Sequence, residues 1–160
     1  MELIKATVED KSLLKNLYSF YLHDLSAYNH TLVSNEEGVF EFDSFHLIWE
    51  KDGITPYLMK EGTALLGFFL LLEKPLMTKV DYCVNDFFLY QRYRGKGYAE
   101  QIVQMLFNEK KGHYYIAQLV KNKRAVAFWK KIYQQFNIEF EENFEVEDGE
   151  EVVFQTFEVK

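Results

Sequence analysis

The chain has 160 residues, 48% of them hydrophobic and 18% aromatic, with only two prolines and a net charge of −7. This composition predicts one compact domain over residues 1–160 and excludes a long disordered tail. No leader segment opens the chain, no apolar run approaches the ~20 residues that span a bilayer, and Cys83 is the only cysteine. We therefore expect a cytoplasmic protein without disulfide bonds.

The charge is unevenly distributed along the chain. Between Gln91 and Lys131 there are ten Lys or Arg residues and two acids, which leaves eight bases and twenty-three acids elsewhere. A local cationic zone on an acidic body favours a compact polyanion bound at one place. It argues against nucleic acid tracked along a broad basic face. A solvated charged surface is the alternative that charge alone leaves open.

The first half of the chain predicts two helices and a hairpin. Thr7–Asp10 has a capping-box pattern, and the apolar spacing after it predicts a helix to about Tyr28. A short second helix is predicted over Ser44–Trp49, before "DGITP" breaks the pattern. Residues 57–72, with a turn at Glu61-Gly62, predict a β-hairpin whose second strand is well buried.

The second half predicts alternating strands and helices. Lys79–Tyr90 is a strand pattern, and the apolar spacing from Ala99 to Phe107 predicts an amphipathic helix that ends at Gly112. The stretch "HYYIAQLV" predicts a strand and is followed by a third helix, so this strand–helix–strand unit should be parallel and right-handed. The tail predicts a second hairpin, turning at Asp148-Gly149, with four apolar residues on one side: Ile138, Phe140, Phe144 and Val146.

The stretch "QRYRGKG" links the predicted strand before it to the amphipathic helix after it. Its glycines, Gly95 and Gly97, allow a tight turn, and the free amides at the start of the helix form an anion site. Arg92, Arg94 and Lys96 add positive charge there. The spacing matches neither the P-loop nor the dinucleotide fingerprint. We therefore predict a phosphate-binding turn of another kind.

Two motifs resemble those of a known superfamily. Arg92-x-x-Gly95-x-Gly97 after a strand resembles the cofactor signature of the GNAT superfamily of acetyl-CoA-dependent N-acetyltransferases. The stretch "NKRAVAFWKK", from Asn122, resembles the later Asn-x-x-Ala-x-x-Phe-Tyr block of that superfamily. The motifs cover residues 80–133, and "DFFLYQRYRGKG" and "FWKKI" are similar to a subgroup of predicted acetyltransferases without an assigned substrate.

The resemblance implies an α/β fold of the GNAT type. Its mixed sheet would have about six to seven strands, with a central parallel pair that splays apart, flanked by about four helices. It implies acetyl-CoA as the acetyl donor, held at thirteen positions: Phe88, Leu89, Tyr90, Arg92, Arg94, Gly95, Lys96, Gly97, Tyr98, Ala99, Asn122, Phe128 and Trp129. Lys121, Lys123, Arg124 and Lys130 are candidate contacts for the 3′-phosphate, and Gln118 is a polar residue that could face the same cleft.

The reaction implied by the resemblance is direct attack of a primary amine on the thioester in a ternary complex. Asp86 is the candidate general base, directly or through water; the alternative is that it only orients a strand or caps a backbone group. Trp129 stands where the family has its acidic tyrosine, and an indole N–H cannot serve as the acid. Tyr133, one turn later, is the candidate acid, with a core tyrosine as the alternative.

The acceptor amine is not identified by the sequence, and its site is expected in the first third of the chain. An aromatic wall with acids there would suit a cationic amine, although such a stripe is also typical of a helical core: Tyr18, Tyr21, Asp24, Tyr28, Trp49 and Tyr57. The four histidines have no ligand spacing, so no metal is predicted. We expect no nucleic-acid or membrane partner, and a monomer or homodimer. The alternative function is a catalytically degenerate coenzyme A-binding regulatory domain, consistent with Trp129.

Overall fold

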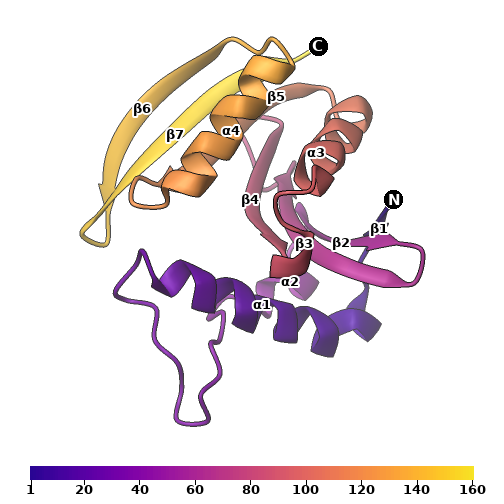
Figure 1. Cartoon of the computed structure of the whole chain (residues 1–160), viewed down its shortest axis with the longest axis vertical. Helices are drawn as coiled ribbons and strands as arrows, with labels where there is room; N and C mark the ends of the chain where they lie inside the picture. The colour runs from indigo at the N-terminus through magenta and orange to yellow at the C-terminus, as the bar shows by residue number, and fades with distance from the viewer.

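One seven-stranded sheet forms the centre of the structure, a computed structural model that describes all 160 residues (Figure 1). The strands lie in the order β1-β2-β3-β4-β5-β7-β6. Neighbours pair antiparallel except β4 and β5, which are parallel, so the predicted mixed sheet with a central parallel pair is confirmed. The strands are β1 (Glu2–Lys5), β2 (Ile54–Glu61), β3 (Ala64–Glu73), β4 (Tyr82–Leu89), β5 (Gly112–Leu119), β6 (Phe140–Glu147) and β7 (Glu150–Val159).

Four helices cover the sheet and divide its core in two. They are α1 (Lys11–Ser26), α2 (Leu47–Glu50), α3 (Tyr98–Glu109) and α4 (Lys123–Gln135). In Figure 1, α3 and α4 lie side by side against the sheet, and they contribute to a core cluster of 18 buried residues. A second cluster of nine buried residues joins α1 and α2 to the opposite face.

The apolar run in β3 is explained by burial on both faces of the sheet. Phe69 and Leu71 belong to the cluster under α3 and α4, whereas Phe68 and Leu70 belong to the cluster under α1. A strand covered on both faces has no solvent side on which polar residues could alternate. The continuous pattern "LLGFFLLL" therefore marks the centre of the domain.

A β-bulge in β4 decides where Asp86 points. Asp86 pairs with Leu70 and Val84 pairs with Leu71, so Asn85 between them has no partner in β3. Val84 packs in the cluster under α3 and α4, but the Asp86 side chain reaches Tyr18 of α1 on the opposite face. The extra residue thus turns the carboxylate of Asp86 toward α1.

The parallel pair β4–β5 is short. Only Tyr82–Tyr114 and Cys83–Tyr115 are paired, and the two strands part beyond them. Beyond Cys83, β4 pairs with β3 alone, which leaves the backbone of its β5-facing side without a strand partner. This parting confirms the predicted splayed pair and creates an opening between the two halves of the sheet.

Gly67 fixes the path of the end of β4. A methyl group on Gly67 would lie 1.9 Å from the carbonyl oxygen of Phe88 and 2.9 Å from the Cα atom of Leu89. The Tyr90 amide also donates to the Leu66 carbonyl at 2.9 Å. Only glycine permits this approach, so β3 holds in place the residues that lead into the turn of Gly95 and Gly97.

Most predicted elements are confirmed, with four differences. β1 was not predicted because "ELIK" has no alternation and forms a short, largely exposed edge strand. The second helix was predicted from Ser44 but is the single turn of α2. Gly112 does not end α3, which stops at Glu109; it begins β5 with a φ of +138°. Phe144 and Val146 stay 59% and 74% exposed because no element covers that end of β6, an edge strand.

Replacing Gly67 with alanine should destabilise the domain by about 3 kcal/mol, the upper end of the range for overpacking, because the obstructing atoms are backbone. Gly62→Ala is the matched control: its left-handed φ of +59° is strained by a side chain, but nothing lies within 4 Å of the new methyl group. The control should lose only about 1 kcal/mol in urea unfolding. Equal losses would contradict the close-approach explanation.

Candidate active site

The turn between β4 and α3 is shaped by two glycines in left-handed conformation. Gly95 has a φ of +70° and Gly97, the residue before the first turn of α3, has a φ of +84°. A side chain at either position would cost about 1–2 kcal/mol of backbone strain. No atom lies within 4 Å of the place where a Cβ would project, so the backbone of this turn faces open space.

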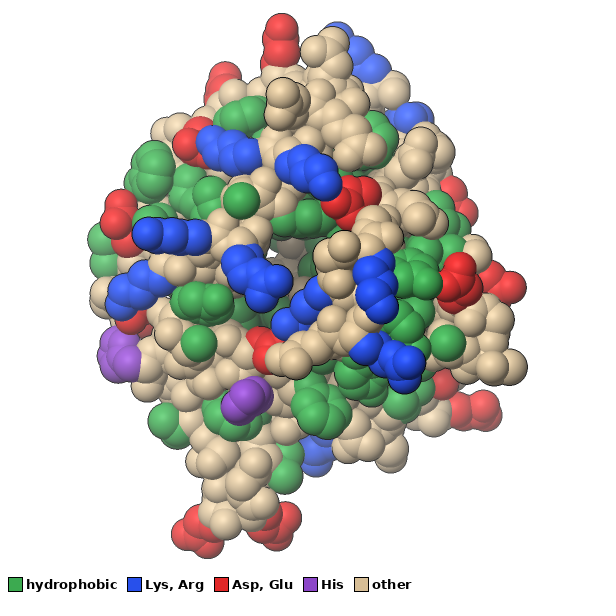
Figure 2. All heavy atoms as spheres, in the orientation of Figure 1, with side chains coloured by type: hydrophobic (Ala, Val, Ile, Leu, Met, Phe, Trp, Pro, Cys, Tyr) green, Lys and Arg blue, Asp and Glu red, His purple; other side chains and the backbone are tan.

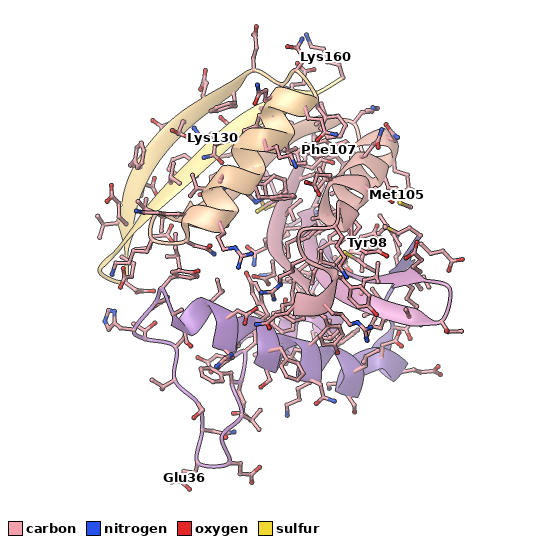
Figure 3. The ribbon with its side chains drawn as sticks, in the orientation of Figure 1. Glu36, Tyr98, Met105, Phe107, Lys130 and Lys160 are labelled. Atoms are coloured by element: carbon pink, nitrogen blue, oxygen red, sulfur yellow. The ribbon has the colours of Figure 1, made fainter.

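The start of α3 offers unpaired backbone amides to that space. The first intrahelical bond runs from the Gln101 amide to the Gly97 carbonyl, so the amides before it have no partner within the helix. Gly97 has no side chain with which to cap them. Figure 3 shows Tyr98 at this end of α3, where its hydroxyl donates to Glu61 Oε2 at 2.7 Å. Amides so placed attract an anion.

A cavity of about 430 Å³ opens beside the turn. Figure 2 shows the hollow on this face, with Lys and Arg side chains around it. Its walls come from α1, the end of β4, the turn, and the first residues of α3 and α4. Nine of the thirteen residues predicted to hold a cofactor line it: Phe88, Leu89, Arg94, Gly95, Gly97, Ala99, Asn122, Phe128 and Trp129. The other four, Tyr90, Arg92, Lys96 and Tyr98, belong to the same turn but do not line the cavity.

Both acids that line the cavity are neutralised by bases. Asp24 of α1 is paired with Arg94 at 2.5 Å, and Arg94 also donates through Nε to the Leu89 carbonyl at 2.7 Å. Glu100 is paired with Lys131 at 2.7 Å, which lowers the pKa of its carboxyl group. Arg124 is the one charged lining residue without an ion pair. The uncompensated charge of the cavity is therefore positive.

The other predicted cations divide into two groups. Lys121 is paired with Glu150 at 2.9 Å, and Lys130, on the side of α4 that faces β6, is paired with Glu142 (Figure 3). Four cations around the turn and the start of α4 have no ion pair: Arg92, Lys96, Lys123 and Arg124. These four are the ones available to a bound polyanion.

Asp86 lies close to the cavity but does not line it. Its Oδ2 atom accepts a hydrogen bond from the Tyr18 hydroxyl at 2.7 Å. Burial raises the pKa of Asp86, and hydrogen bonding with Tyr18, Asn85 and Tyr21 offsets only part of that effect. The result is a carboxyl group whose pKa is above its usual range, next to the wall that α1 contributes to the cavity.

Of the candidate residues at α4 and in β5, Asn122 lines the cavity, whereas Tyr133 and Gln118 do not. The Asn122 side chain accepts from the Ala125 amide at 3.2 Å and so begins α4, while it also lines the cavity. Tyr133 is buried and donates to Gln155 Oε1 at 3.0 Å, outside the cavity. Burial raises the pKa of its hydroxyl. Gln118, also buried, donates to the same Gln155 oxygen at 2.9 Å and does not face the cavity either.

The proposed aromatic acceptor wall is assembled only in part. Tyr21 and Asp24 of α1 line the cavity, and Tyr28, two residues beyond the end of that helix, does so as well. Tyr18 lies behind them, completely buried and stacked on Phe42. The remaining two, Trp49 and Tyr57, pack elsewhere, against Phe45 and Phe69 respectively.

A family model described as the acetyltransferase (GNAT) family matches residues 15–133. The chain belongs to the GNAT acetyltransferase family. The match spans α1 through most of α4, and therefore includes every wall of the cavity. No curated protein sequence matches the chain significantly.

Solved structures of other proteins described as acetyltransferases share the fold. An acetyltransferase of Thermus thermophilus aligns with a TM-score of 0.68 at 15% identity, over 97% of this chain and 94% of its own. A spermidine N-acetyltransferase of Vibrio cholerae aligns with a TM-score of 0.64 at 16% identity, over 99% and 95%. A Salmonella typhimurium protein solved with its cofactor acetyl-CoA aligns with a TM-score of 0.63 at 12% identity, over 99% and 94%.

The cavity fits the cofactor that the GNAT family uses. The open backbone at Gly95 and Gly97 and the free amides of α3 suit a diphosphate, and the four unpaired cations add positive charge beside them. The departure from the family motif is Trp129, which lines the cavity and packs edge-to-face on Phe87 and Phe128. The Trp129 side chain therefore contributes aromatic packing to the cavity wall but has no hydroxyl group that could act as an acid.

Sequence reasoning missed several residues of the cavity. Phe87 lines it as Phe88 and Leu89 do, and the strand pattern around "DFFLY" was the signal that could have included it. Leu25 also lines the cavity, and its helical spacing after Tyr21 on α1 was the signal that could have included it. The ion pair of Asp24 with Arg94 joins residues 70 positions apart and has no local signal.

Clustered metal ligands and membrane-spanning helices are both absent from the structure. No group of three or more His, Cys, Asp or Glu side chains is arranged to hold a metal ion. None of the helices is both long enough and apolar enough to cross a lipid bilayer.

Gly97→Val should abolish acetyl-CoA binding, because its side chain would project into the open space above the turn and block the α3 amides. Gly38→Val is a matched control, since Gly38 has a nearly equal φ of +79° with nothing within 4 Å, in a distant loop. Both variants should lose similar stability on heating, and only Gly97→Val should lose binding in isothermal titration. Retained affinity in Gly97→Val would contradict the site.

The division of the cations into paired and unpaired residues predicts which of them contribute to acetyl-CoA binding. Lys123→Gln with Arg124→Gln should weaken acetyl-CoA binding by about tenfold or more, since hydrogen bonds to a charged group contribute roughly 1.5–3 kcal/mol each. Lys121→Gln with Lys130→Gln changes the net charge equally but removes side chains already engaged by Glu150 and Glu142. Binding titrations at two salt concentrations should show the larger loss and the larger change in salt dependence for the first pair. The reverse order would refute this assignment.

Proposed function

We propose that the chain transfers the acetyl group of acetyl-CoA to the nitrogen of a primary amine, by direct attack within a ternary complex. The observation that carries the proposal is the continuity of the cavity. It begins at the glycine turn and the free α3 amides, passes the parted end of β4, and reaches Tyr21 of α1 and Tyr28 just beyond that helix. One site would thus hold the donor at one end and a second molecule at the other.

Acetyl-CoA supplies the acetyl group as a thioester, and the residues of this chain bind and orient it. The unpaired amides at Tyr98 and Ala99 and the cations Arg92, Lys96, Lys123 and Arg124 would hold its phosphates. The backbone of β4 beyond Cys83 has no partner on its β5-facing side, so it can pair with the amide groups of the pantetheine arm. A backbone amide at Phe88 or Leu89 is the proposed donor to the negative charge that develops on the acetyl oxygen.

Asp86 is the proposed general base. An amine attacks only in its neutral form, and ammonium groups predominate at neutral pH, so a base must accept one proton per turnover. Asp86 is the only carboxylate of β4 and forms no ion pair, and its raised pKa brings it closer to the working range of a base. The proposal contains no general acid, because the only hydroxyl of α4, that of Tyr133, is bonded to Gln155 outside the cavity. When the C–S bond of the thioester breaks, coenzyme A would leave as the thiolate and take a proton from solvent.

A second function is favoured by one observation. Trp129 occupies the position of the family's acidic tyrosine, as it would in a coenzyme A-binding regulatory domain that had lost its chemistry. Free thiol release from acetyl-CoA over a panel of primary amines separates the two functions. Binding of acetyl-CoA with thiol release dependent on an amine supports the enzyme, and binding without release for any amine supports the regulatory domain.

Asp86→Asn should lower kcat by about 10²-fold or more and leave acetyl-CoA affinity nearly unchanged. Because the pKa of Asp86 is raised in the folded state, its ionisation opposes folding as pH rises above its unfolded pKa, so the asparagine variant should be more stable at neutral pH. Asp81→Asn is the control: the pKa of Asp81 is lowered by the His113 amide and Lys74, so this variant should lose stability and keep its turnover. A pH–rate profile for Asp86→Asn that retains the acidic limb of the wild type would exclude Asp86 as the base.

A further inference from the structure

Asp86 is separated from the cavity by one side chain of α1. Tyr21 lines the cavity, whereas neither Asp86 nor Tyr18 does. Tyr18 donates a hydrogen bond to Asp86 Oδ2 at 2.7 Å. The Tyr21 ring packs against both Tyr18 and Phe88, which lies two residues from Asp86 and belongs to the same core cluster as Tyr18. Tyr21 also helps to offset the raised pKa of Asp86. Tyr21 is therefore the residue that joins the cavity wall to the surroundings of Asp86.

The Tyr21 ring is fixed by aromatic packing. Its ring lies edge-to-face on Tyr18 at 6.1 Å, on Phe68 at 5.9 Å and on Phe88 at 6.5 Å between centroids. These contacts come from its own helix, from β3 and from β4, so the ring cannot leave without disturbing the core. The bulge at Asn85 holds Asp86 on the same side. Hydroxyl and carboxylate are thus positioned independently of any ligand.

Few groups compete for a proton at Asp86. Tyr18 and Tyr21 face it from α1, and Cys83 and Asn85 are its neighbours on β4. Burial and then the charge of Asp86 raise the pKa of the Cys83 thiol to about 12, so the thiol stays protonated. Burial also raises the pKa of both tyrosines, so neither ionises on its own. No Lys, Arg or His forms an ion pair with Asp86.

We propose that Tyr21 relays the proton of the acceptor ammonium to Asp86. The ammonium N–H bond breaks and its electron pair stays on nitrogen, while the Tyr21 oxygen takes that proton and passes its own to the Asp86 carboxylate. Tyr21 is a neutral phenol before and after the transfer. Asp86 stays protonated until it returns the proton through Tyr21 to solvent, after the product leaves. The relay rests on the proposed N-acetyltransferase function and assigns a residue to it.

Steady-state kinetics of four variants test the relay: Tyr21→Phe, Tyr18→Phe, Asp86→Asn, and Tyr21→Phe combined with Asp86→Asn. The substrate is the amine of the panel that gives the fastest thiol release. Tyr21→Phe should lower the plateau kcat by about 10²-fold or more, with the KM for acetyl-CoA nearly unchanged. Tyr18→Phe removes the other hydroxyl at Asp86 but not the path from the cavity, so it should mainly move the acidic limb of the pH profile to higher pH. Tyr21→Phe combined with Asp86→Asn should be no slower than the slower single variant, because both interrupt one path.

A titration without substrate tests the contact itself. Carbon-13 NMR of the Asp86 carboxyl group should show a higher pKa in Tyr21→Phe than in the wild type, since a hydrogen bond to the charged form is lost. Tyr28→Phe, which removes a hydroxyl from the cavity wall but not from Asp86, should leave that pKa unchanged. An unchanged pKa in Tyr21→Phe, or fully additive losses in the double variant, overturns the relay alone. Binding of acetyl-CoA with no turnover of any amine overturns the proposed function and the relay together.

Discussion

The early parting of β4 from β5 is the constraint on which the rest of the structure depends. The two strands share only two residue pairs, and beyond Cys83 each is held from its other side alone: β4 by β3, and β5 by β7. The close approach at Gly67 keeps the end of β4 against β3, so the strand cannot drift back to fill the opening. The cavity, the free backbone of β4 and the access to α1 all follow from that opening.

The distribution of ion pairs decides what the opening can receive. An acidic protein would repel a polyanion, but both acids of the cavity wall are neutralised by bases of the turn and of α4. The guanidinium of Arg94 is already engaged by protein groups, because it joins Asp24 of α1 to the Leu89 carbonyl at the end of β4. Charge for a bound phosphate is left to the cations without partners, which lie at the turn and at the start of α4.

The sequence predicted those parts of the site that depend on neighbours along the chain. The glycine turn was predictable because left-handed backbone and free helix amides are local properties, and the turn is bounded by a clear strand and a clear helix. The start of α4 was predictable because Asn122 caps the helix three residues before Ala125. The sheet of seven strands was predictable except for β1, whose four residues have no distinctive alternation.

What could not be predicted depends on residues far apart in the chain. Tyr18 and Asp86 are 68 positions apart, and the bulge that brings them together leaves no trace in the pattern "CVNDFF". The same holds for the separation of the paired from the unpaired lysines, since Glu142 and Glu150 belong to the distant hairpin of β6 and β7. The burial of Tyr133 against Gln155 likewise depends on the packing of α4 against β7.

The proposed function requires that the diphosphate of coenzyme A lies on the amides that begin α3, beside Gly95 and Gly97. A crystal structure of the protein with acetyl-CoA would show whether it does. We expect diphosphate oxygens within hydrogen-bonding distance of those amides, with the acetyl group between the parted ends of β4 and β5. A cofactor bound elsewhere, with the turn facing only solvent, would rule out this site.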